Sequence, residues 1–145
     1  MAPRYVLDTD VLVAALRSDR GASRQLLYAA LDRSLELLLS VPLLLEYEAV
    51  LTRREQLAAC GLSTGDVHRV LDDLAAVAKP VKLVYRWRPQ LPDPDDDMVL
   101  ETAVNGNAGA IVTFNQRDFK AAKLSFGFAV ILPRVALYQI RRSGP

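Results

Sequence analysis

The sequence predicts an α/β fold in which helices cover both faces of a mostly parallel central sheet. Mostly apolar runs occur at 5–7, 35–39, 110–114 and 128–132, and short apolar runs bounded by turn signals are typical of buried strands. Between these runs, apolar residues recur with the spacing of one helical face. Strands that alternate with helices form parallel sheets with helices on both sides. We therefore expect a three-layer α/β/α sandwich.

The length and composition of the chain fit one globular domain that spans 1–145. Of its 145 residues, 51% are hydrophobic and 24% are charged, a balance typical of a folded domain. A formal net charge of +1 provides no global attraction to nucleic acid or membranes, although it leaves a local groove open. The single cysteine excludes an internal disulfide and a cysteine-rich metal site. Because neither a signal peptide nor a membrane-spanning run is visible, we expect a cytoplasmic protein without membrane contact.

Capping residues and prolines predict where the helices begin and end. Ser40 followed by Pro42 predicts a helix that starts at about Val41. Ser63 with Asp66 three residues later resembles a capping box, and the apolar stripe behind it continues to residue 77. A further strand is predicted after Pro80. That strand covers 81–85, and the other predicted helices cover 11–16, 26–31, 98–104 and 133–140.

Two aspartates interrupt the first apolar run, where Tyr5-Val6-Leu7 leads into Asp8-Thr9-Asp10 and a second apolar run follows. Buried carboxylates are costly unless something compensates their charge. The carboxyl end of a central parallel strand is the place where open α/β sheets bind ligands. The alternative is structural: one aspartate caps the following helix and the other is solvated.

Further polar side chains occur at corresponding places in the chain. Four acids within Asp93–Asp97 precede a helix, Glu46 lies near the start of another, and Asn115 and Asp118 follow a strand. Strand ends and helix starts share one edge of a parallel sheet, where carboxylates repel each other unless a cation lies among them. Oxygen donors without histidine or cysteine suit Mg²⁺ or Mn²⁺. Such a site can orient a water and stabilise in-line displacement at a phosphodiester.

The stretches that carry these side chains resemble the PIN-domain nucleases. The resemblance covers Val6–Leu16, Ser40–Leu51, Asp93–Asp97 and Ile111–Phe119, in the order of the family and over nearly the whole chain. The subgroup it resembles most is the toxin component of bacterial toxin–antitoxin pairs. The resemblance implies a magnesium-dependent endoribonuclease, with Mn²⁺ as a possible substitute, that cleaves RNA, forms a homodimer and binds a cognate antitoxin. We expect these protein contacts to involve the second and third predicted helices.

The resemblance also implies roles for individual acids. The implied catalytic residues are Asp8, Glu46 and Asp96, and the implied metal ligands are Asp8, Asp96, Asp97 and Asn115. Asp96 is taken as the third acid because Ala103 then keeps the spacing of the family within the helix, and Asp97 is the alternative. Asn115 stands where many members have a fourth aspartate. A neutral amide there would weaken a second metal site.

Four further residues have supporting roles by the same resemblance. Thr9 and Thr113 match hydroxyl positions that hold acids or waters. Asp10 stands where the family commonly has asparagine. It could add a ligand or accept a backbone hydrogen bond, and we favour the backbone hydrogen bond. Asp118 lies close behind Asn115.

Two other functions fit parts of the sequence. Asp8-Thr9-Asp10 also resembles the DxD motif of haloacid-dehalogenase-type phosphatases, in which Asp8 would be the nucleophile and Asp10 the acid–base residue. That function leaves Glu46 unexplained. The other is a degenerate, non-catalytic PIN-like module that binds RNA or protein, for which Asn115 is the support. A metal titration with Asp8→Asn as the control separates this module from both enzymes.

Overall fold

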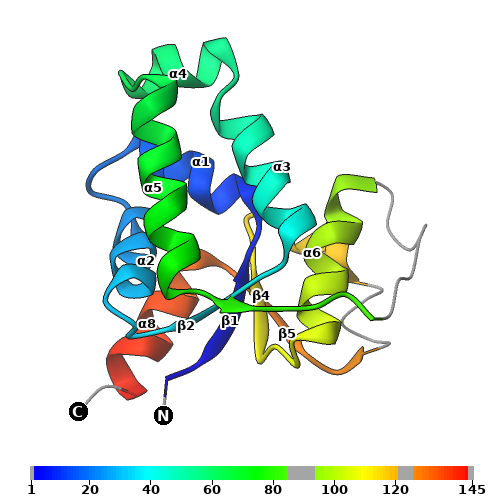
Figure 1. Cartoon of the computed structure of the whole chain (residues 1–145). Coiled ribbons are helices and arrows are strands. Elements are labelled where there is room, and N and C mark those ends of the chain that lie inside the picture. Colours follow the sequence, from blue (N-terminus) through cyan, green and yellow to red (C-terminus); the bar gives the residue numbers. More distant parts are fainter. Residues whose placement is uncertain (1, 85–93, 121–125, 144–145) are drawn as a thin grey trace.

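Five strands form one parallel sheet in the part of the chain that the structure describes (Figure 1). The structure is a computed structural model that describes residues 2–84, 94–120 and 126–143, and at 94–96 only the backbone. The strand order is β3-β2-β1-β4-β5, which confirms the predicted α/β class. The strands are β1 (Arg4–Leu7), β2 (Glu36–Leu39), β3 (Lys79–Pro80), β4 (Ala110–Val112) and β5 (Ala129–Ile131).

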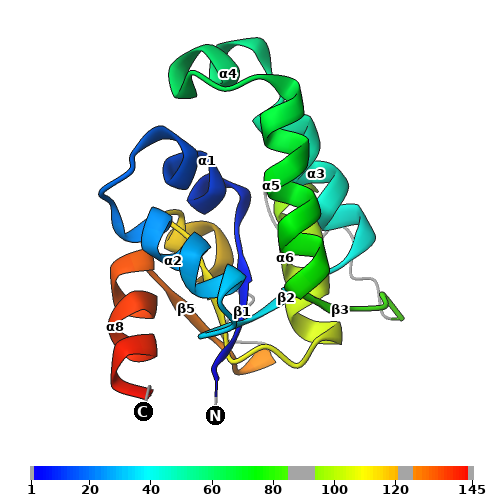
Figure 2. The same cartoon turned by 60° about the vertical axis from the view of Figure 1, so that its left-hand side comes forward.

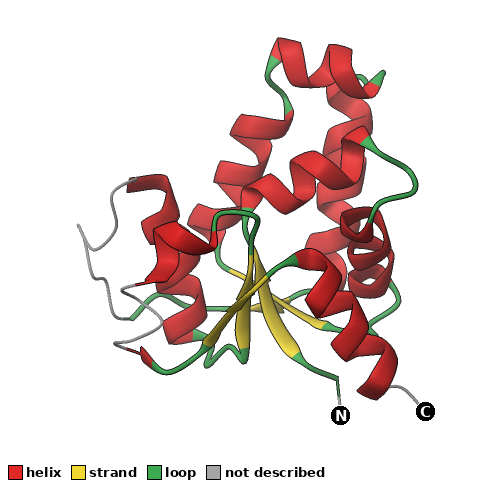
Figure 3. Cartoon of the chain, turned by 180° about the vertical axis from the view of Figure 1, so that it is seen from behind, coloured by secondary structure: helices red, strands yellow, loops and turns green. Residues whose placement is uncertain are grey.

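Helices cover both faces of the sheet and the carboxyl ends of its strands. They are α1 (Thr9–Arg17), α2 (Ala22–Leu31), α3 (Val41–Leu51), α4 (Arg54–Cys60), α5 (Thr64–Val77), α6 (Pro94–Asn105) and α8 (Pro133–Ser143), with a 3₁₀ helix η1 (Gln116–Phe119). Helices α2, α5 and α8 lie on one side of the sheet and α6 on the other, while α1, α3 and α4 lie above the carboxyl ends of the strands (Figures 1 and 2). The view from behind shows the strands enclosed from above and from both sides (Figure 3).

None of the helices in the described segments is long and apolar enough to cross a membrane. The sheet instead forms the core of a layered domain. Val6 and Leu7 of β1 and Ile111 and Val112 of β4 are all fully buried. Strands covered on both faces have apolar residues at consecutive positions, and this is the pattern that the sequence has at these strands.

The capping residues act as their sequence positions predict. Ser40 Oγ accepts the Leu43 N–H at 3.3 Å at the start of α3. At the start of α5, Ser63 Oγ accepts the Asp66 N–H and the Asp66 carboxylate accepts the Ser63 N–H, so the capping box is confirmed. Each cap satisfies backbone donors that the first helical turn leaves open.

Two elements differ from the sequence-based prediction. β3 pairs with β2 at Lys79–Pro80, and the predicted strand over 81–85 is wrong at 81–84, with residue 85 outside the described part of the chain. A proline has no N–H to donate, so the pairing is short, and it ends with the Val81 N–H bonded to the Leu39 carbonyl at 2.9 Å. The short helix α4 had no clear periodicity to predict it, and it ends at Gly61, whose φ is 68°.

Tyr47 ties helix α3 to the end of the central strand. Its ring is fully buried and its hydroxyl donates to the Leu7 carbonyl. This bond lies next to Asp8 in the chain, so it fixes α3 over the carboxyl end of β1.

We expect Tyr47→Phe to lower the free energy of unfolding by about 1–3 kcal/mol, because the buried Leu7 carbonyl would lose a donor. Urea unfolding monitored by circular dichroism measures the change. Tyr138→Phe is the matched control, since the Tyr138 side chain is 60% exposed. Equal stability of the Tyr47→Phe variant and the wild type would contradict the structural role of this hydroxyl.

Candidate active site

The site lies where the direction of the chain across the sheet reverses. From β1 the chain moves through β2 to β3 on one side, and β4 and β5 occupy the other side. Ligands of open α/β sheets bind at such a reversal, outside the carboxyl ends of the strands. The pairing register places Leu7 of β1 opposite Val112 of β4. The next residues of the two strands, Asp8 and Thr113, are therefore neighbours.

Hydrogen bonds to both oxygens of its carboxylate hold Asp8 in place. Oδ1 accepts the Thr9 N–H at 2.7 Å, which makes Asp8 the N-cap of α1. Oδ2 accepts the Thr113 hydroxyl at 2.7 Å, and only 5% of the residue is exposed. Asp8 therefore caps α1, which is the structural role that the sequence left open. Its other carboxylate oxygen faces the end of β4.

Asp10 joins the start of α1 to the segment after β4. Its Oδ2 accepts the Phe114 N–H at 3.1 Å, the Asn115 side-chain amide at 3.1 Å and the Thr113 hydroxyl at 3.4 Å. The backbone hydrogen bond predicted for Asp10 is confirmed. Its Oδ1 is buried, and none of the residues that the structure describes donates a hydrogen bond to it. We call Asp8 and Asp10 the acidic pair.

The acidic pair is electrostatically strained. Burial, and secondly the negative charge of Asp8, raise the pKa of Asp10 from 3.8 to about 7, although hydrogen bonds from the Phe114 N–H and the Thr113 hydroxyl oppose the shift. Like charges in a poorly hydrated place disfavour ionisation. A divalent cation beside the pair would offset this repulsion, and carboxylate oxygens are the donors that a hard ion prefers.

Helix α3 brings a third carboxylate to this end of the sheet. Glu46 is half-buried and precedes Tyr47, whose hydroxyl donates to the Leu7 carbonyl. Burial, and secondly the charge of Asp8, raise the pKa of the Tyr47 phenol above its usual value. The tyrosine therefore lies within electrostatic reach of Asp8 and stays a neutral donor.

Helix α6 contributes two buried acids. Asp97 is 1% exposed and Glu101 is fully buried, and residues four apart lie on the same face of a helix. The Ser40 and Thr102 hydroxyls are 2.7 Å apart, which joins α6 to the start of α3. The sequence-based prediction did not include Glu101. Its spacing from Asp97 was the available signal, but a charged residue in a helix is usually solvated.

A profile of the PIN domain matches residues 4–117. The chain belongs to the PIN domain family. Members of this family are typically magnesium-dependent nucleases. A comparison with curated proteins returns no match. The family assignment favours the nuclease over the phosphatase with a DxD motif, and it leaves the toxin–antitoxin role as a proposal.

The structure of this PIN domain brings some of the predicted site residues together. Asp8, Asp10, Thr113 and Asn115 form one hydrogen-bonded group. Asn115 is exposed, and Asp118 is half-buried in η1, where its N–H donates to the Asn115 carbonyl at 3.0 Å. Thr9 contributes its backbone N–H to Asp8.

A complete metal centre stays a prediction for this PIN domain. Among the side chains that the structure describes, no group of three or more His, Cys, Asp or Glu could hold a metal ion. The side chain of Asp96 lies outside the described part of the chain. The convergence of Glu46 and the third acid on the acidic pair, and the choice between Asp96 and Asp97, therefore remain predictions.

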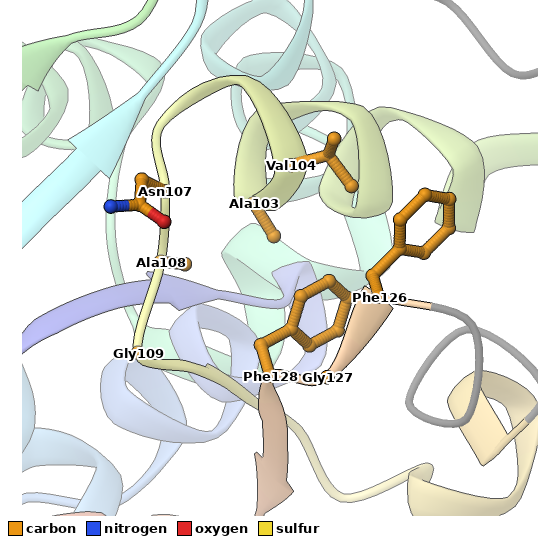
Figure 4. A pocket seen from close by; sticks show the side chains of 8 residues that line it. All are labelled: Ala103, Val104, Asn107, Ala108, Gly109, Phe126, Gly127 and Phe128. Atoms are coloured by element: carbon orange, nitrogen blue, oxygen red, sulfur yellow. The ribbon is translucent and has the colours of Figure 1, made fainter.

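A separate pocket of about 290 Å³ lies at the other end of α6 (Figure 4). Phe126 and Phe128 face the last turns of α6 across it, with ring planes within 5° of each other. The described residues that line it include no titratable group. Its chemistry offers nothing for phosphodiester hydrolysis, which leaves the carboxyl edge of the sheet as the candidate active site.

The raised pKa of Asp10 predicts a pH-dependent stability in the absence of metal. Between about pH 4 and 7 the folded protein retains a proton that the unfolded chain has released, since the pKa rises from 3.8 to about 7 on folding. Binding of this proton to Asp10 therefore stabilises the folded protein. The stabilisation is fully present below about pH 4 and is lost as the pH rises through about 7.

Thermal unfolding of wild type and Asp10→Asn in EDTA, from pH 5 to pH 8, measures this effect. The Tm of the variant should rise relative to wild type as the pH increases. Asp72→Asn, at an exposed position of α5, is the control and should follow the wild-type pH dependence. Parallel curves for Asp10→Asn and wild type would contradict the raised pKa.

Proposed function

We propose that this PIN domain is a magnesium-dependent endoribonuclease that acts as the toxin of a toxin–antitoxin pair. The observation that carries the proposal is the acidic pair itself, two neighbouring carboxylates that hydrogen bonds hold at the reversal of the sheet. Membership of a family of typically magnesium-dependent nucleases supports the same chemistry.

The proposed metal ligands are the carboxylates that surround this point. Asp8 would hold the ion together with Asp96 or Asp97, and the Asn115 amide oxygen would add a neutral ligand. When bound, Mg²⁺ or Mn²⁺ would activate a water and stabilise the charge of an in-line displacement at phosphorus. Because Asn115 is neutral, a second ion would bind weakly.

The residues of the chain contribute orientation and charge. Asp8 cannot rotate without breaking its bonds to Thr9 and Thr113, so it presents its carboxylate in one direction. Asp10 holds the segment after β4 against α1 through Phe114 and Asn115. Glu46 is proposed to accept a hydrogen bond from the attacking water. Fixed groups of this kind lower the barrier because they need no reorganisation during the reaction.

Asp8→Asn should lower Mg²⁺-dependent cleavage of single-stranded RNA by more than about 100-fold. Loss of residues that only support a metal ligand already lowers metal affinity or activity by about 10–100-fold. The fold should persist, because asparagine caps a helix as well as aspartate does. Removal of one repulsive charge should also leave the Tm in EDTA equal or higher.

A panel of RNAs incubated with and without Mg²⁺ measures this cleavage, with Asp19→Asn, an exposed residue, as the matched control. Cleavage retained by Asp8→Asn would overturn the nuclease proposal. A wild type that binds RNA but cleaves none of the panel would instead support the non-catalytic module.

The proposed homodimer and antitoxin contacts use surfaces away from the acidic pair. On α3, the side chains of Val41 and Leu45 are 69% and 57% exposed, and on α2 Tyr28 is 47% exposed. A shallow, mainly apolar pocket of about 160 Å³ adjoins α3 and includes Leu44 and Pro80. Exposed apolar side chains of this kind are typical of protein interfaces.

Leu45→Glu should therefore convert a homodimer to a monomer in analytical ultracentrifugation, because a charge would be buried at the interface. Asp73→Lys, a charge change at an exposed position of α5, is the control. A wild type that sediments as a monomer at every working concentration would exclude the homodimer.

A further inference from the structure

A pocket of about 480 Å³ lies beside the acidic pair. It is formed by α1, the starts of α2 and α8, and the segment after β4. We call it the Phe114 pocket, after an aromatic side chain that lines it while remaining 49% exposed. A large aromatic ring left half in solvent beside a candidate active site is available to a ligand.

The Phe114 pocket adjoins the acidic pair through Phe114 and helix α1. The Phe114 N–H donates to Asp10 Oδ2 at 3.1 Å, so the backbone that presents the ring is fixed by Asp10 itself. Ala14, which also lines the pocket, lies four residues after Asp10 on the same face of α1. Residues four apart in a helix are about 6 Å apart. One bound strand could therefore contact both the pocket and the acids.

The polar lining of the pocket suits an anionic, hydrogen-bonding ligand. Arg134 is exposed at the start of α8, and Ser23 lines the pocket although only 4% of it is exposed. Neither α2 nor α8 carries an acid in its first turn, so their positive N-terminal ends are not neutralised.

We propose that the Phe114 pocket binds one nucleotide of a single-stranded RNA next to the bond that is cleaved, with its base stacked on Phe114 and a phosphate at Arg134. The inference rests on the proposed ribonuclease function and names its substrate subsite. Aromatic rings combined with cations bind single strands because every base offers a face for stacking. Ser23 would hydrogen-bond the base or the ribose.

Binding of a 5′-labelled, ten-nucleotide RNA in EDTA, followed by fluorescence anisotropy, tests the subsite without cleavage. Phe114→Ala should weaken binding by about 5- to 150-fold, the range expected for one stacked base, and Phe114→Trp should retain it. Tyr138→Ala removes another exposed aromatic and should have no effect on binding.

Arg134→Ala tests the phosphate contact. It should weaken binding and reduce the slope of log K against log salt by about 0.7. Arg141→Ala, at the other end of α8, should change neither quantity.

Abasic substitutions in the RNA locate the stacked nucleotide. At one position, removal of the base should weaken binding to the wild type. With that RNA, Phe114→Ala should cause no additional loss of affinity, because the two changes remove the same contact. At the other positions the loss caused by Phe114→Ala should persist.

Three results would overturn the proposed subsite. They are unchanged binding by Phe114→Ala, an equal loss of affinity in Tyr138→Ala, or losses from Phe114→Ala and from base removal that add at every position of the RNA. Circular dichroism confirms that each variant is folded. The catalytic proposal is tested separately by Asp8→Asn in Mg²⁺, so RNA binding that depends on Phe114 would support the subsite even if cleavage were absent.

Discussion

The Asp10 carboxylate is the contact on which the rest of the site depends. One of its oxygens accepts hydrogen bonds from the backbone of Phe114 and the side chain of Asn115, and so links the first helix to the segment after β4. These segments are about a hundred residues apart in the chain. The link keeps the Asp10 charge close to that of Asp8, and burial makes this arrangement costly. Local strain of this kind is typical of functional sites.

Several hydrogen bonds hold the surrounding helices where the acidic pair needs them. Tyr47 fixes α3 to the end of β1, and Ser40 joins the start of α3 to Thr102 of α6. Each bond connects elements whose own acids, Glu46 on α3 and Asp97 on α6, are wholly or partly buried. The framework is rigid because its polar contacts are buried. A rigid framework fixes the orientation of the carboxylates that it carries.

The acidic pair and its neighbouring pocket differ in charge and polarity. The pair carries two carboxylates, and the pocket is mostly apolar, with Phe114, Arg134 and two helix N-termini. A nucleic-acid strand has the same two chemistries, a backbone of phosphates that can share a metal ion and bases that can stack. The net charge of the chain, +1, gave no sign of this local arrangement.

Much of the fold could be predicted from the sequence because its signals are local. The apolar runs, the Ser40 cap and the Ser63–Asp66 capping box depend only on neighbouring residues, and the structure has the corresponding strands and helices at these places. The strand predicted at 81–85 failed at 81–84 because pairing depends on the partner strand, which meets Lys79–Pro80 instead.

The sequence by itself determined most of the element types and the placing of Asp8, Glu46 and Asn115 near the ends of strands or the starts of helices. Only the tertiary structure decided which of the polar groups meet. The register of β1 with β4 places Asp8 beside Thr113, and helix packing buries Glu101 and forms the Phe114 pocket. Spacing along the chain cannot predict such contacts, because they arise from the pairing and packing of segments that are distant in sequence.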